Sequence, residues 1–525
     1  MTRLRFSGAF ALLCFSSLTA CSGSSSPTGT VAGGDSGVDA APPADAGGPD
    51  VTAPSDAGLE AAPPADAAEA SPPLDAADAS DAADGGPFTA PTTPIDLAPQ
   101  SAEVLGFTTD GYVAYATEVS QSIGEIDVVP LHGGPPQLVT ARGYITTAIV
   151  AGDVVTAGNV VWTAATGAHP LDAASGNFTG LALVGDHVAI AYDDASGAHT
   201  AVLASRDLSS QVSLGPSTCN VLLKAVAGRV AVATCTATDA GTAGSLDAWD
   251  ASGQKMHLLS SADAFSALDG DDPSATIYAA SYSTVQSVPI AGGMPTGFYQ
   301  HPYANVRQLS LLAGHQALVF SLYESSIYFS PTSAPNLTSP PNGPSFALNN
   351  GACQSPVEAV SPDGQWYVAG SCLTTVADGR SRISTAWDAG TASGPTTAYV
   401  TAAGFTSDSR YAYYFESPNL GGEYLGVYEL ATGTATLVSP ALLMSTNAQT
   451  LYRTETTSDG RIVYVDVSAV LDGGPSDRGI LTVLNPAAPA QRPTIDAATT
   501  SFLLDPARTG VAFSNAQGLH YVALP

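Results

Sequence analysis

Residues 360–369 read Val360-Ser361-Pro362-Asp363-Gly364-Gln365-Trp366-Tyr367-Val368-Ala369. The Asp-Gly pair in this stretch is typical of a tight turn between two antiparallel strands. The aromatic and β-branched residues after the turn favour a strand. Similar stretches begin at Val104, Phe405 and Thr456, where an Asp-containing turn again precedes an apolar run. We therefore predict a β-hairpin at each of these places.

A longer period of about 43 residues runs through residues 95–525. Within one period, short apolar runs alternate with Gly, Asp, Pro and Ser turns about every eight to twelve residues, the pattern of an all-β chain. Ten such units begin near Val104, Ile145, Leu181, Val221, Phe265, Val306, Val360, Phe405, Thr456 and Phe502. The sequence therefore predicts an all-β fold made of repeated four-stranded antiparallel units.

The Ser-Pro-Asp-Gly turn and the strand after it resemble the repeat of TolB-like and WD40-like (PD40-type) β-propellers. The resemblance covers most of residues 95–525, although no unit has the Trp-Asp ending of true WD40 blades. It implies a β-propeller of about seven to ten blades. Single propellers typically have four to eight blades. One large ring, two rings, and units that pair into one blade all remain open.

The last unit has three apolar runs, at 501–504, 510–514 and 519–524, where four are expected. The short run at 95–97, just before the first unit, could supply the missing strand. Such an exchange would join the two ends of the propeller and cover an exposed sheet edge. We therefore expect residues 95–97 to pair with the C-terminal unit.

The N-terminus carries Arg3 and Arg5, a short apolar run, and then Leu18-Thr19-Ala20-Cys21. The run is too short for a permanent membrane span. The last four residues resemble the lipobox of bacterial lipoproteins. The resemblance implies a signal peptide at 1–20 and acylation (palmitate) of Cys21. Because Ser22 follows the cysteine, it also implies anchoring in the outer membrane of the cell envelope. The protein would then be either periplasmic or surface-exposed. A plain secretory signal with a chance cysteine is the alternative.

Residues 21–94 are expected to form a lipidated, disordered tether. The stretch is rich in Ala, Pro, Asp and Gly, holds twelve acidic residues and no Lys or Arg, and has Phe88 as its only aromatic residue. Such a composition buries too little apolar surface to offset the conformational entropy of the chain. The predicted domains are therefore 1–20, 21–94 and the propeller at 95–525.

Four cysteines lie within the repeats, and an exported chain favours disulfides over free thiols. Cys219 and Cys235 flank a predicted hairpin turn at Ala227-Gly228, and Cys353 and Cys372 flank the turn at 362–365. A hairpin places such flanking residues opposite one another. We predict the disulfides Cys219–Cys235 and Cys353–Cys372, with four reduced buried thiols as the alternative.

The chain has 16 Lys and Arg against 47 Asp and Glu, a net charge of −31, which argues against nucleic acid as a partner. No nucleophile elbow, zinc motif or phosphate loop is found, so we expect no catalytic residues, metal or cofactor. Asp269-Gly270-Asp271-Asp272 has the carboxylate density that calcium prefers, but we expect a solvated turn there. The predicted function is a non-catalytic binding or scaffold module with a protein or glycan partner at the propeller face. The alternative is an extracytoplasmic hydrolase or lyase that acts on glycan or peptide through carboxylates at the propeller mouth.

Overall fold

The computed structural model describes residues 93–524, except for residues 101, 121–122, 145–147, 172–173, 195, 240, 301–305, 312–316, 323–326, 332–356, 370–371, 376–380, 384–398, 418–422, 443–453 and 467–477. All described residues belong to one compact unit, which includes Gly85–Pro525. The predicted signal peptide, Cys21 and nearly all of the predicted tether lie outside the described residues. Within them, no helix is long and apolar enough to cross a membrane.

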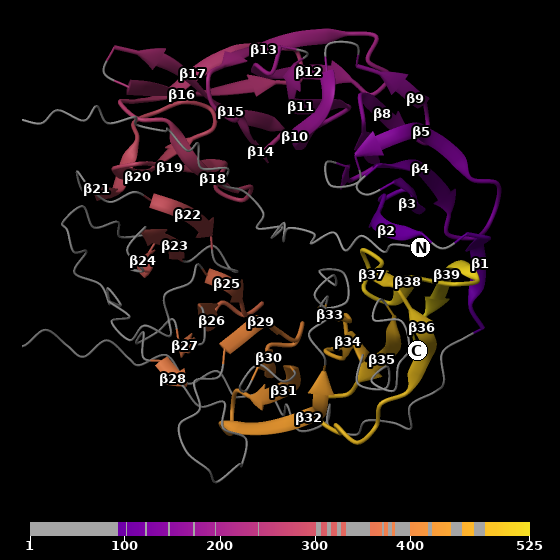
Figure 1. The fold of residues 1–525 in the computed structure, drawn as a ribbon. Coiled ribbons are helices and arrows are strands. Elements are labelled where there is room, and N and C mark those ends of the chain that lie inside the picture. Colours follow the sequence, from indigo (N-terminus) through magenta and orange to yellow (C-terminus); the bar gives the residue numbers. More distant parts are fainter. Residues whose placement is uncertain are drawn as a thin grey trace, which may run out of the picture. The chain divides into compact units, whose positions relative to one another are not determined.

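The described chain folds into ten antiparallel sheets, numbered here 1 to 10, which follow one another along the sequence (Figure 1). Sheets 1 to 5 contain the strands β2 Glu103–Phe107, β3 Tyr112–Ser120, β4 Ile123–Pro130 and β5 Gln137–Tyr144; β6 Ile149–Ala151, β7 Val154–Ala157, β8 Val160–Thr163 and β9 Gly167–Pro170; β10 Ala174–Val184, β11 His187–Asp194, β12 His199–Ser205 and β13 Gln211–Ser217; β14 Leu222–Val226, β15 Arg229–Thr238, β16 Gly241–Asp250 and β17 Lys255–Ser261; and β18 Phe265–Asp271, β19 Thr276–Ser281, β20 Thr284–Pro289 and β21 Thr296–Gln300.

Sheets 6 to 10 contain the strands β22 Val306–Leu311, β23 Ala317–Leu322 and β24 Ile327–Pro331; β25 Val357–Val360, β26 Trp366–Ala369, β27 Cys372–Thr375 and β28 Ser381–Ile383; β29 Tyr399–Phe405, β30 Tyr411–Ser417, β31 Glu423–Glu429 and β32 Thr434–Leu442; β33 Thr454–Thr456, β34 Ile462–Asp466, β35 Gly479–Leu484 and β36 Thr494–Thr499; and β37 Ser501–Leu504, β38 Gly510–Asn515 and β39 Gly518–Ala523, together with β1 Ile95–Ala98. Sheet 6 has three described strands, and each of the others has four.

The ten sheets correspond one to one with the ten predicted units, so the all-β prediction is confirmed. Each predicted start lies within or a few residues from the first strand of a sheet, as Val104 does in β2 and Phe265 in β18. Because every unit forms its own sheet, the idea that two units pair into one blade is wrong. The second and third strands of sheet 1 are longer than its first strand. Strand β3 continues to Ser120 because its outer half pairs with the start of β4.

Among the described residues, buried apolar clusters join sheets 1 to 6 in sequence order, sheets 7 to 10 likewise, and sheet 10 to sheet 1. Ile126 of sheet 1 lies in one buried cluster with Val155 and Trp162 of sheet 2. Leu425 of sheet 8 shares a buried cluster with Ile462 of sheet 9. Burial of such side chains stabilises the fold by roughly 1.5–3 kcal/mol each. Sheets stacked through their faces in sequence order are the arrangement of a β-propeller.

The N-terminal strand β1 completes sheet 10, as predicted. It pairs antiparallel with β39, with Ile95 opposite Tyr521 and Asp96 opposite His520 (Figure 1). Leu97 is buried in a cluster with Val113 and Val129 of sheet 1. The two ends of the described chain therefore share one sheet, and that sheet packs against the first.

Candidate functional site

A buried hydroxyl organises the turn after the first strand in sheets 7, 8 and 9. In sheet 8, Thr406 is fully buried, and its Oγ1 accepts a hydrogen bond from the backbone N–H of Tyr411 (3.1 Å) and donates one to Asp408 (2.5 Å). Ser361 and Thr457 make the equivalent bonds in sheets 7 and 9. The Ser/Thr-x-Asp part of the repeat is therefore a local hydrogen-bonded cap that starts the second strand.

The same turns bond to one another from sheet to sheet. The backbone N–H of Asp363 donates to Ser409 Oγ at 2.9 Å, and Ser407 Oγ donates to the Thr457 carbonyl at 2.6 Å. The Ser458 N–H continues the series to the Arg508 carbonyl at 3.0 Å. The first turns of sheets 7 to 10 thus form one connected edge of the propeller.

A pocket of about 160 Å³ opens beside this edge, between sheet 8 and the loop that follows β35 of sheet 9. Two cross-strand rows of sheet 8 make its floor. One row holds Tyr411, Glu429 and Thr434, and the next holds Val427 and Thr436. Strand pairing fixes the spacing of these side chains, so the floor is built from the rigid part of the sheet.

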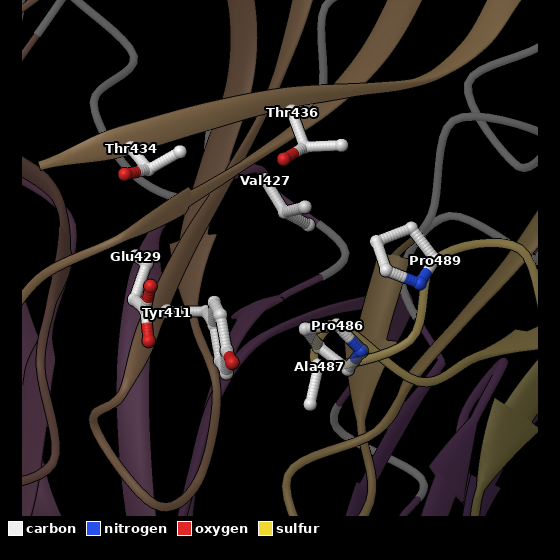
Figure 2. A pocket seen from close by; sticks show the side chains of 8 residues that line it. All are labelled: Tyr411, Val427, Glu429, Thr434, Thr436, Pro486, Ala487 and Pro489. Atoms are coloured by element: carbon white, nitrogen blue, oxygen red, sulfur yellow. The ribbon is translucent and has the colours of Figure 1, made fainter. Parts of the chain in front are cut away.

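The opposite wall comes from Pro486, Ala487 and Pro489, which face the Tyr411–Glu429 pair in Figure 2. Asn485 shapes this loop, because its Oδ1 accepts the Ala487 N–H at 3.0 Å and its carbonyl accepts the Ala488 N–H at 3.0 Å. Each proline ring also fixes a backbone angle. The wall is therefore preorganised before any ligand binds.

The polar groups of the pocket are one carboxylate and several hydroxyls. Glu429 Oε2 accepts a hydrogen bond from Thr432 Oγ1 at 2.7 Å. Burial, with a smaller contribution from the Glu429 charge, raises the pKa of Tyr411 above its ordinary value. A tyrosine hydroxyl is a neutral donor at neutral pH in either case. The guanidinium of Arg410 lies over the Tyr411 ring, 5.7 Å from its centroid. The pocket thus offers a negatively charged acceptor beside neutral donors and apolar walls.

The acidic stretch at 269–272 joins three sheets, which differs from the solvated turn that we expected. Asp269 Oδ1 lies 2.7 Å from Lys224 Nζ of sheet 4, and its Oδ2 accepts the Leu311 N–H of sheet 6 at 2.6 Å. Asp271 is buried, and Asp272 Oδ1 accepts the Ala227 N–H at 2.7 Å. Sequence could not reveal this, because the partners lie about 40 residues away. In the described part of the chain, no group of His, Cys, Asp and Glu could hold a metal ion.

A disulfide joins Cys219 to Cys235, as predicted, with the two Cα atoms 5.7 Å apart. The hairpin between them turns at Ala227 and Gly228, which both have positive φ, as a two-residue type I′ turn requires. Cys372 begins β27, whereas Cys353 lies outside the described residues, so the second disulfide stays a prediction. Cys21 lies outside them too.

No family model matches the chain, and no curated protein matches it. Similar solved structures include Sqt1 of Saccharomyces cerevisiae, at 11% identity and a TM-score of 0.35 over 84% of this chain and 100% of that one. The C-terminal WD40 domain of Sif2 is similar at 10% identity and a TM-score of 0.34 over 84% and 100%. A nidogen/laminin complex shows 11% identity and a TM-score of 0.26 over 44% and 76%. The ten consecutive sheets, with buried apolar clusters between described neighbours, give this chain the arrangement of a β-propeller.

Proposed function

We propose that this protein is an outer-membrane lipoprotein of the cell envelope whose propeller is a non-catalytic binding module. In this proposal the signal peptide 1–20 is removed, Cys21 is acylated, and residues 22–94 act as a tether. More than one acyl chain gives stable anchoring, which a single chain does not. The lipobox-like Leu18-Thr19-Ala20-Cys21 and the acidic linker support the anchor.

The pocket between sheets 8 and 9 is the observation that carries the binding role. It combines a rigid floor, a preorganised wall and a few convergent polar groups, which is the usual make-up of a ligand site. Glycan hydrolysis would require two carboxylates flanking one bond. Among the described residues that line this pocket, Glu429 is the one carboxylate. The geometry therefore favours recognition over cleavage.

Site-specific crosslinking in the native envelope tests the binding role. A photo-crosslinking amino acid placed at Thr436, inside the pocket, should give a discrete adduct in cells that carry the lipoprotein. The same group at Asp110, in an exposed turn of sheet 1, is the matched control and should not give that adduct. Equal adducts from both positions, or none from Thr436, would remove the support for a binding site here.

Mass spectrometry of the mature protein tests the anchor independently. An N-terminal peptide that starts at Cys21 and carries acyl mass is the expected result. An unmodified peptide that starts elsewhere, or a Cys21→Ala protein that is still processed and membrane-bound, would contradict the lipoprotein assignment.

A further inference from the structure

We infer that the pocket between sheets 8 and 9 binds the side chain of a lysine or arginine presented by a partner protein. This inference rests on the proposed binding function and names the chemistry of the ligand. Four properties of the site carry it: the free acceptor of Glu429, the apolar walls, the covered face of Tyr411, and the charge of the whole chain.

The Glu429 carboxylate calls for a hydrogen-bond donor. Its Oε2 accepts a hydrogen bond from Thr432, and within the described part of the chain Oε1 accepts none, so one acceptor oxygen remains for a ligand. An ionised carboxylate only accepts hydrogen bonds. Charge-assisted bonds to a cation are about twice as strong as neutral ones. A positively charged head group suits this position best.

The walls suit the stem of a long basic side chain. Pro486 and Pro489 present carbon atoms on the wall that faces the Tyr411–Glu429 row of sheet 8 (Figure 2). Lysine and arginine bury their methylene stems along apolar surface while the charged head stays near polar groups and water. A slot with apolar sides and one carboxylate matches both halves of such a side chain.

A sugar fits this pocket less well because no aromatic platform is available. Tyr411 is only 8% exposed, and the guanidinium of Arg410 lies over its ring. A pyranose that stacks would need an open ring face of the kind that Tyr411 does not offer. The net charge of −31 adds a long-range attraction for basic surfaces, and this attraction speeds their approach.

The test compares two short peptides on the detergent-solubilised lipoprotein by saturation-transfer NMR. The first is acetyl-Ala-Lys-Ala-amide, and the second carries norleucine, which keeps the stem and lacks the ammonium. One side chain in a partly open pocket should bind with a Kd of about 1 mM or weaker. The lysine peptide should bind about tenfold more tightly than the norleucine peptide, and the difference should shrink in high salt.

Variants assign the effect to the pocket. Glu429→Gln should remove the preference for lysine, whereas Asp110→Asn, which changes the net charge equally at an exposed turn, should leave it intact. Equal binding of both peptides, or an unchanged preference in Glu429→Gln, would overturn the inference. Binding of methyl glucoside that depends on Glu429 would overturn it in favour of a sugar. None of these results affects the crosslinking test at Thr436. The proposed ligand class can therefore be wrong while the proposed binding function is still supported.

Discussion

Asp96 Oδ1 lies 2.8 Å from Nδ1 of His520, which joins β1 to β39 across a sequence separation of 424 residues. The other imidazole nitrogen, Nε2, lies 3.1 Å from Asn515 Oδ1. The ring also packs against Phe513, with their centroids 5.3 Å apart. His520 of β39 therefore contacts β1 through one ring nitrogen and Asn515 of β38 through the other, which links three strands of sheet 10.

Truncation of His520 should destabilise the protein more than truncation of Asp96. His520→Ala removes a packed ring and two polar contacts and should lower the free energy of unfolding by about 1–2 kcal/mol. Asp96 is 87% exposed at its side chain, so Asp96→Ala should cost less than about 1 kcal/mol. Denaturant unfolding of both variants checks the order. A larger loss for Asp96→Ala would show that the Asp96–His520 contact, and not the packed ring, holds β1 in place.

The buried hydroxyl of Thr406 should contribute measurably to the free energy of unfolding. Thr406→Val keeps the shape but leaves the Tyr411 N–H and Asp408 without their partner, which should cost about 1–3 kcal/mol. Thr436→Val, on an exposed position of the same sheet, should change stability by less than about 0.5 kcal/mol. Thermal unfolding of the two variants measures the contrast. Equal effects would mean that the turn does not depend on the hydroxyl.

Loss of the Cys219–Cys235 disulfide should cost about 3 kcal/mol, because the bond closes a loop with a sequence separation of 16. Urea unfolding of the parent and of the double variant Cys219→Ser with Cys235→Ser measures the difference in the free energy of unfolding. Peptide mapping without reduction should recover this link and also Cys353–Cys372. A link between Cys219 and Cys353 would contradict the hairpin pairing of both.

The stability of the protein should depend on pH through Asp127. Burial, and then the charge of Glu125, raise the pKa of Asp127 from 3.8 to about 6. A folded-state pKa above the unfolded value means that the folded state holds the proton more tightly. The contribution of Asp127 to stability is therefore fully present below about pH 4 and is lost as the pH rises through 6.

Asp127→Asn removes this titration. At pH 7.5 the variant should be more stable than the parent by roughly 1–2 kcal/mol, a value discounted for partial solvent screening. At pH 4 the two should be nearly equal. Urea unfolding at both pH values is the measurement, with Asp110→Asn as the exposed control. A variant less stable than the parent at pH 7.5 would mean that the carboxylate is stabilised in the fold by a partner.

Local signals predicted most of the architecture. The Asp-containing turns marked where the first two strands of a sheet meet, and the Ala227-Gly228 turn set the register that brings Cys219 to Cys235. The spare run at 95–97 was recognisable because the last unit lacked a strand. These features succeeded because each depends on residues close in sequence, or on a simple count of strands.

Features that depend on contacts between sheets could not be predicted. The pocket forms where the loop with Pro486 and Pro489 lies against sheet 8, which contains Glu429. The sequence around Glu429 has no motif that indicates a pocket. In the sequence, Asp269 is one of several carboxylates in predicted turns. In the structure it contacts Lys224 and the Leu311 N–H. Such partners are set by how whole sheets pack, which the strand pattern does not specify.

Strand β1 joins the two ends of the propeller, and the melting temperatures (Tm) of two deletion variants test this pairing. Deleting residues 91–99 removes β1 and its pairing with β39, so the Tm should fall by roughly 5 °C or more. A synthetic peptide of residues 91–100 in excess should restore part of the loss. Deleting residues 22–85, which belong to the predicted tether, should leave the Tm nearly unchanged. If both variants melt at the temperature of the parent protein, the pairing of β1 with β39 does not hold the propeller together.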